Sequence, residues 1–183
     1  MHTHMYNDRQ NELLNRFTGK VQPYMLEARR RGVLLDLGHG AGSFLWPVAS
    51  GAMSQGFPPD TISTDIHAHS ILIQQSDMPN VMSKMMLLGM RLEDVILHST
   101  VSPATEIGRF PELGTLGEGR VADIAVLENQ SGVFAFKDSW PAKRLAGRRL
   151  ECVLTIRDGR IVYDRDGRTF PAWKSAGDYG VIQ

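Results

Sequence analysis

Apolar positions along the first third of the chain alternate between the spacing of helices and that of strands. Residues 33–37 form a nearly continuous apolar run, which is typical of a buried parallel strand. Helical patterns precede and follow this run, at residues 23–31 and 46–55, and a short strand-like stretch, 61–64, leads into Asp65. The order helix, strand, helix, strand predicts an α/β fold with a parallel sheet covered by helices.

The pattern changes in the rest of the chain. Residues 76–108 carry helical patterns, whereas β-rich runs dominate afterwards. One strand is expected at 121–127, and "LECVLTIRDGRIVYD" indicates a hairpin whose strands are joined by Asp158 and Gly159, a strong two-residue turn signal. We therefore predict three parts: an α/β part over residues 1–110, a β part over residues 111–168 and a loose tail over residues 169–183.

Composition narrows the classes of partner. The 183 residues include 20 basic and 20 acidic side chains, so the chain has no net charge. The composition therefore shows no excess of positive charge of the kind that binds nucleic acid or a membrane surface. No apolar stretch approaches the ~20 residues that a membrane span needs, and the start of the chain lacks the profile of a signal peptide. Because Cys152 is the only cysteine, no disulfide forms within the chain. We expect a cytoplasmic protein that acts on a small-molecule substrate.

The stretch "DLGHGAGSF", residues 36–44, is the most prominent local motif and has more than one interpretation. Glycines at every second position after a strand resemble the methyl-donor loop of S-adenosylmethionine-dependent methyltransferases, with Asp65 as the acid that binds ribose hydroxyls. That fold needs several more βα units after Asp65, yet no strand-like run follows before Val121. An esterase could use "HGAG" as an oxyanion loop, but the chain has no GxSxG motif. The methyltransferase remains the alternative to a hydrolase.

Three ionisable residues follow successive predicted strands. If "MHTHM" closes a strand, then His4, His39 and Asp65 all lie at the C-terminal ends of neighbouring parallel strands. Side chains at such positions build the active site of a (β/α)8 barrel. Histidines and an aspartate that converge there suit a divalent metal that activates water, with the carboxylate as proton acceptor.

Five segments, taken in order, resemble the amidohydrolase superfamily, and in particular its dihydroorotase-like branch, which includes amide and ester deacetylases. They are "HTHMYN", "VLLDLGHGAGSF", "PDTISTDIH", "LGMRLEDVILHSTVSPATEIG" and "LGTLGEGRVADIAVL". The resemblance implies the C-terminal part of a (β/α)8 TIM-type barrel, about strands six to eight, followed by a small β-sandwich segment. It also implies one or two divalent metals, usually zinc, and hydrolysis of an amide, cyclic amide or ester bond.

The resemblance also assigns roles to single residues when the strands are counted backwards. Taking "MHTHM" as the HxH pair of a first strand fails, because a complete barrel of ~250 residues would have to follow it. Asp65 would instead end the eighth strand, as catalytic base and metal ligand, and His4 would end the sixth as a metal ligand. His39, at the end of the seventh strand, would face the substrate and orient it or polarise its carbonyl. Gly40 and His67 would also bind the substrate. His67 and His69 would line its mouth, although a solvated loop explains these two histidines nearly as well.

The resemblance covers only the later strands of such a barrel. Nothing in the chain corresponds to the first five strands, so the HxH pair, the bridging lysine and the fifth-strand histidine of the family have no counterpart here. We therefore expect the isolated chain to bind metal weakly and not to turn over. The missing ligands would come from a separate N-terminal half or from a homo-oligomer, and a non-catalytic remnant is a third interpretation.

Overall fold

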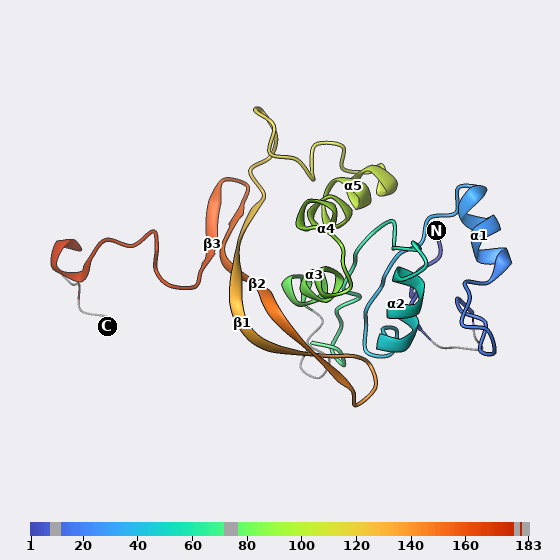
Figure 1. The fold of residues 1–183 in the computed structure, drawn as a ribbon. Coiled ribbons are helices and arrows are strands. Elements are labelled where there is room, and N and C mark those ends of the chain that lie inside the picture. Colours follow the sequence, from blue (N-terminus) through green and yellow to red (C-terminus); the bar gives the residue numbers. More distant parts are fainter. Residues whose placement is uncertain (8–11, 72–76, 178–179, 181–183) are drawn as a thin grey trace.

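The computed structural model describes residues 1–7, 12–71, 77–177 and 180. Within these ranges, five α-helices precede a three-stranded antiparallel sheet with the order β1-β2-β3 (Figure 1). None of the helices described is long and apolar enough to cross a membrane. The helices are α1 (Pro23–Arg30), α2 (Trp46–Met53), α3 (Met78–Leu87), α4 (Leu92–Ser99) and α5 (Val101–Ile107). The strands are β1 (Ile124–Lys137), β2 (Lys143–Arg157) and β3 (Arg160–Asp164), and the short helix η2 (Trp173–Ser175) follows them.

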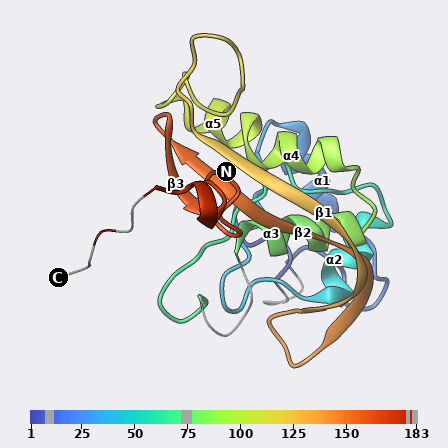
Figure 2. The ribbon, with the colours of Figure 1, turned by 90° about the vertical axis from the view of Figure 1, so that its left-hand side faces the viewer.

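The β1–β2 hairpin curves around α3, and α1 lies on the side of the molecule away from the sheet (Figures 1 and 2). The hydroxyl of Ser83 in α3 accepts a hydrogen bond from the backbone N–H of Leu150 in β2, with a donor–acceptor distance of 2.9 Å. Met82 and Met85 of α3 are buried in the same apolar cluster as Leu150. The helical part and the sheet thus share one apolar cluster. The predicted division of the chain into an α/β part and a β part after residue 110 stays a prediction.

Three extended segments pair in parallel, as the sequence pattern predicts. The three segments are residues 1–7, 33–40 and 60–65, called here the first, middle and third segments. His2 pairs with Leu35 and Asp36 pairs with Thr61, both in parallel, so the middle segment lies between the other two. The pairing continues to Gly40, whose N–H donates to a carbonyl of the third segment at 2.9 Å. Since all three segments run in one direction, the residues at their carboxyl ends come together at one edge.

Asp36 joins the three segments through its buried carboxylate. Its oxygens accept hydrogen bonds from the hydroxyls of Thr3 at 2.6 Å, Thr61 at 2.7 Å and Ser63 at 2.7 Å. A carboxylate removed from water needs donors of this kind, because burying a charge without them is costly. The acidic residue that resembled part of a methyl-donor loop therefore has hydrogen-bond donors within the chain itself, and it connects one segment to the next.

The first strand of the sheet is longer than the sequence pattern predicts. The expected strand at 121–127 corresponds only to the beginning of β1, which is 14 residues long. The pairing of β1 with β2 shifts register between Val126 and Leu127 and again between Ser131 and Phe134. Irregularities of this kind bend a strand and increase its twist, which lets the hairpin follow the surface of α3.

The turn between β2 and β3 confirms the predicted hairpin. Asp158 and Gly159 both adopt left-handed backbone angles, with φ of 49° and 74°. Two consecutive residues with positive φ form the type of turn whose twist matches that of paired strands. The backbone N–H of Asp158 also donates to the carboxylate of Asp123 at 2.7 Å, which attaches the turn to the chain before β1.

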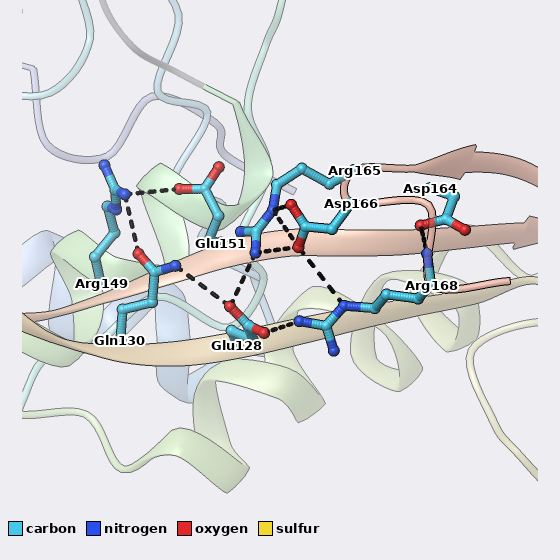
Figure 3. Close-up of polar contacts among 8 residues, drawn as sticks. All are labelled: Glu128, Gln130, Arg149, Glu151, Asp164, Arg165, Asp166 and Arg168. Carbon is cyan, nitrogen blue, oxygen red and sulfur yellow. Dashed lines mark hydrogen bonds and ion pairs between the residues drawn. The ribbon is translucent and has the colours of Figure 1, made fainter. Parts of the chain in front are cut away.

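A network of ion pairs attaches the turn after β3 to the sheet (Figure 3). Arg165 donates to Asp166 at 2.6 Å and to Glu128 of β1 at 3.1 Å, and Arg168 also pairs with Glu128. The side chains in these pairs are between a quarter and a half exposed, so water screens their interaction and each pair contributes little to stability. Because each of these charges has a partner of opposite sign, we interpret the network as structural.

Candidate functional site

His4 and Asp65 form a pair at the carboxyl ends of the first and third segments. The Nδ1 atom of His4 lies 2.6 Å from the carbonyl oxygen of Gly38, which only accepts hydrogen bonds, so Nδ1 carries the proton. In the neutral ring the other nitrogen, Nε2, then presents a lone pair, and it lies 3.8 Å from Oδ2 of Asp65. Both residues have left-handed backbone angles, with φ of 61° and 46°. Such conformations cost energy in residues with side chains, and they concentrate at functional sites.

The geometry of this pair fits two ligands of one divalent ion. Zinc binds histidine nitrogen and carboxylate oxygen at about 2.0–2.2 Å, so atoms separated by 3.8 Å can both reach a single ion between them. A backbone carbonyl that holds the opposite ring nitrogen is the usual support of a metal-binding histidine. In the described part of the chain, no three histidine, cysteine, aspartate or glutamate residues form a cluster that could hold a metal. Within the described residues the pair therefore offers two candidate ligands, fewer than the four that zinc usually takes in proteins.

Two glycines of the middle segment let the backbone approach this pair closely. A β-carbon added at Gly40 would lie 2.5 Å from Oδ2 of Asp65, and one added at Gly38 would lie 2.7 Å from Nδ1 of His4. Both glycines also have positive φ, 51° and 49°, which glycine adopts without strain. The spacing of the "GHG" motif therefore follows from the packing of the backbone against the two ionisable side chains.

The ring of His39 lies away from the His4–Asp65 pair. It is fully buried and stacks on Phe44, with ring centres 4.9 Å apart. Its Nδ1 lies 2.9 Å from the carbonyl oxygen of Gly40, and its Nε2 lies 2.7 Å from Nζ of Lys84 in α3. These contacts are those of an anchor for the loop: the ring contacts the backbone of Gly40, and no described side-chain contact joins it to His4, Asp65 or His67. Direct contact of His39 with substrate stays a prediction.

His67, predicted to lie at the substrate mouth, is exposed to solvent and is close to Asp65 in the sequence. His67 lies two residues after Asp65, and its Nδ1 accepts a hydrogen bond from the backbone N–H of His69 at 3.2 Å. Gly40 contributes to this region through its backbone, since it contacts the carboxylate of Asp65 directly. Substrate binding by His67 and Gly40 stays a prediction.

Sequence reasoning missed the residue that holds His39. Lys84 lies in the middle of α3, 45 residues further along the chain, and its side chain is fully buried. Lysine is rarely buried unless it is paired, so the amino acid type alone predicts a solvent-exposed position. The one available signal was its surroundings, because Lys84 lies between buried methionines on the apolar face of a helix.

We expect the free energy of unfolding to rise with pH below neutrality because of His39. Burial, and secondly the charge of Lys84, lower the pKa of this imidazole from 6.5 to about 3, so the unfolded chain binds the proton more readily. The contribution is complete above pH 6.5 and is lost as the pH falls toward 3. Between pH 6.5 and pH 5 the expected loss is about 1–2 kcal/mol.

Urea unfolding at these two pH values measures this dependence. Replacement His39→Gln should remove most of the difference, because glutamine does not titrate. The matched change His69→Gln, in an exposed histidine of the same chain, should leave it intact. An identical pH dependence in the wild type and in His39→Gln would show that His39 is not the group responsible.

The arrangement of the elements is that of the C-terminal portion of an amidohydrolase-superfamily protein, and comparison with known proteins confirms that the chain belongs to this superfamily. An adenine deaminase matches with a TM-score of 0.83 and 31% sequence identity, over 88% of this chain and 44% of that one. A dihydroorotase matches with a TM-score of 0.69 and 26% identity, over 88% of this chain and 42% of that one. No protein-family profile matches the chain.

Among curated proteins, the chain is similar to bacterial deacetylases. A deacetylase from Enterococcus faecalis is 30% identical over 166 residues, which cover 88% of this chain and 44% of that protein. A deacetylase from Agrobacterium fabrum is 38% identical over 97 residues, covering 53% of this chain and 24% of that protein. The chain therefore spans less than half the length of the relatives it matches, and these relatives favour the hydrolase interpretation over the methyltransferase.

Proposed function

We propose that this chain supplies part of the active site of a metal-dependent hydrolase that cleaves an amide, cyclic amide or ester bond. The observation that carries the proposal is the His4–Asp65 pair, in which a ring nitrogen with a free lone pair lies 3.8 Å from a carboxylate oxygen. The names of the relatives, which are deacetylases, an adenine deaminase and a dihydroorotase, support a substrate whose carbon–nitrogen bond is hydrolysed.

In this proposal the two residues of the pair have different roles. His4 binds the ion through Nε2, and the carbonyl of Gly38 keeps that nitrogen directed toward Asp65. A divalent ion, which we propose to be zinc, would supply positive charge that polarises a carbonyl and lowers the pKa of water. Asp65 contributes an oxygen ligand, accepts the proton of the attacking water and returns it to the leaving group. Its side chain is 46% exposed, so a substrate can reach it.

The remaining ligands, in this proposal, belong to a polypeptide that corresponds to the N-terminal portion of the relatives. The first, middle and third segments then represent the sixth, seventh and eighth strands of a barrel. Large apolar side chains are exposed on the sheet, among them Leu145 of β2 and Ile161 and Val162 of β3. Exposed apolar surface of this kind supports contact with a further polypeptide.

Titration of the chain with Co²⁺, a spectroscopic substitute for zinc, tests the two ligands. We expect weak binding of Co²⁺. His4→Ala should reduce this affinity at least about 10-fold, because loss of a residue that only supports a metal ligand already costs about that much, and loss of the ligand itself costs no less. His2→Ala is the matched control, since His2 lies two residues away and outside the pair. Equal affinity in the two variants would contradict the proposal. Tight stoichiometric zinc with amidase activity from this chain alone would contradict the expectation that its site is partial.

A further inference from the structure

Lys84 of α3 is a fully buried lysine, and it contacts the loop that carries the proposed site. Its Nζ lies 2.7 Å from Nε2 of His39 and 5.5 Å from the ring centre of Phe44. Among the described residues it forms no ion pair with a carboxylate. A lysine removed from water without a paired carboxylate is costly, and the hydrogen bond to His39 offsets part of this cost.

The two hydrogen bonds of His39 fix the state of its ring. The carbonyl oxygen of Gly40 only accepts, so Nδ1 of His39 carries the proton and Nε2 accepts a hydrogen bond from Lys84. Burial lowers the pKa of His39 to about 3, which keeps the ring neutral near neutral pH, and burial also lowers the pKa of Lys84 to about 7. Nζ donates to His39 in both of its protonation states, because a neutral amine still carries N–H groups.

His39 lies between the two residues that contact the His4–Asp65 pair. The preceding residue, Gly38, accepts the hydrogen bond that directs His4, and the following residue, Gly40, packs against the carboxylate of Asp65. A shift of the His39 backbone, which the hydrogen bonds of its buried ring oppose, would therefore move both contacts together. The buried ring is thus the point at which α3 can act on the geometry of the pair.

We propose that Lys84 is a positioning residue for the His4–Asp65 pair: its hydrogen bond to the buried His39 ring fixes the backbone at Gly38 and Gly40, and this backbone orients the two site side chains. This inference rests on the proposed function, because it deepens the account of the same site. Lys84 itself lies beneath the loop and needs no contact with substrate or metal.

NMR of the full chain labelled with ¹⁵N-histidine tests the proposal without metal. We expect one Nδ1–H tautomer for both His39 and His4 in the wild type. In Lys84→Met, which keeps the length of the side chain but removes its donor, we expect mixed tautomers at both histidines and Co²⁺ affinity about 10-fold lower. Lys84→Gln, whose amide can donate to His39, should restore both properties. Lys20→Met, at an exposed lysine, is the control and should change neither.

The outcomes separate this inference from the function on which it rests. A folded Lys84→Met variant with the wild-type His4 tautomer and wild-type Co²⁺ affinity overturns the positioning role. If Lys84→Met does not fold, Lys84→Gln tests the proposal instead. The proposal then requires that His39 and His4 either both keep the wild-type tautomer or both lose it. A change at His39 alone overturns the proposal. Absence of Co²⁺ binding in the wild type contradicts the proposed function, whereas the tautomers still test Lys84.

Discussion

Replacement Asp65→Asn should lower kcat/KM for hydrolysis by about 10²–10⁴-fold, the usual contribution of a general acid–base residue. The amide of asparagine keeps an oxygen near the position of Oδ2, 3.8 Å from Nε2 of His4, but it cannot accept the proton of water. The backbone at this position has φ of 46°, which asparagine tolerates better than other residues with side chains. The change therefore removes the proton acceptor and keeps the local geometry.

This measurement requires a complete site. The chain can be joined behind the N-terminal portion of the Enterococcus faecalis deacetylase, and hydrolysis of acetylated amides can be followed together with metal content. Asp158→Asn is a matched control, because Asp158 is an exposed aspartate with nearly the same backbone angle, φ of 49°, in the β2–β3 turn. Activity of Asp65→Asn within about 10-fold of the control would rule out the proposed role of Asp65 as the proton acceptor.

The sequence predicted the parallel arrangement of the first half because local patterns there agree with tertiary structure. An apolar run followed by glycine loops indicated buried strands with functional ends, and the structure brings His4 and Asp65 together at such ends. The turn at Asp158 was equally predictable, since few residues adopt two successive positive φ angles. In both cases the pattern that made the prediction possible lies within a few residues, although the parallel pairing itself joins segments far apart in the sequence.

The burial of the His39 ring against Lys84 was not predictable, because it depends on a contact between residues 45 positions apart. A histidine between two glycines indicates a site, but the pattern does not say whether the ring or the neighbouring backbone faces the site. Only the position of α3, which places Lys84 beneath the loop, determines that the ring points inward. The length of β1 escaped prediction for a related reason, because polar residues after Leu127 interrupt the apolar pattern while pairing with β2 continues.

Replacement Gly38→Ala should destabilise the protein by about 3 kcal/mol and also weaken metal binding, because it combines backbone strain with a steric clash. The added β-carbon would lie 2.3 Å from Oγ1 of Thr3 and 2.7 Å from Nδ1 of His4. Both atoms make short hydrogen bonds, Thr3 to Asp36 and His4 to Gly38 itself, each 2.6 Å long. Relief of the clash therefore breaks the contact that directs His4.

Gly56→Ala separates the two causes of this effect. Gly56 follows α2 with φ of 69°, and a β-carbon there would meet no atom within 4 Å, so only the backbone strain of about 1 kcal/mol remains. Urea unfolding and Co²⁺ titration of both variants should show a larger loss of stability in Gly38→Ala and a loss of affinity in that variant alone. Equal destabilisation with unchanged affinity would mean that the Gly38 carbonyl does not orient His4, and the pair would then have to be held by Asp65 and the third segment.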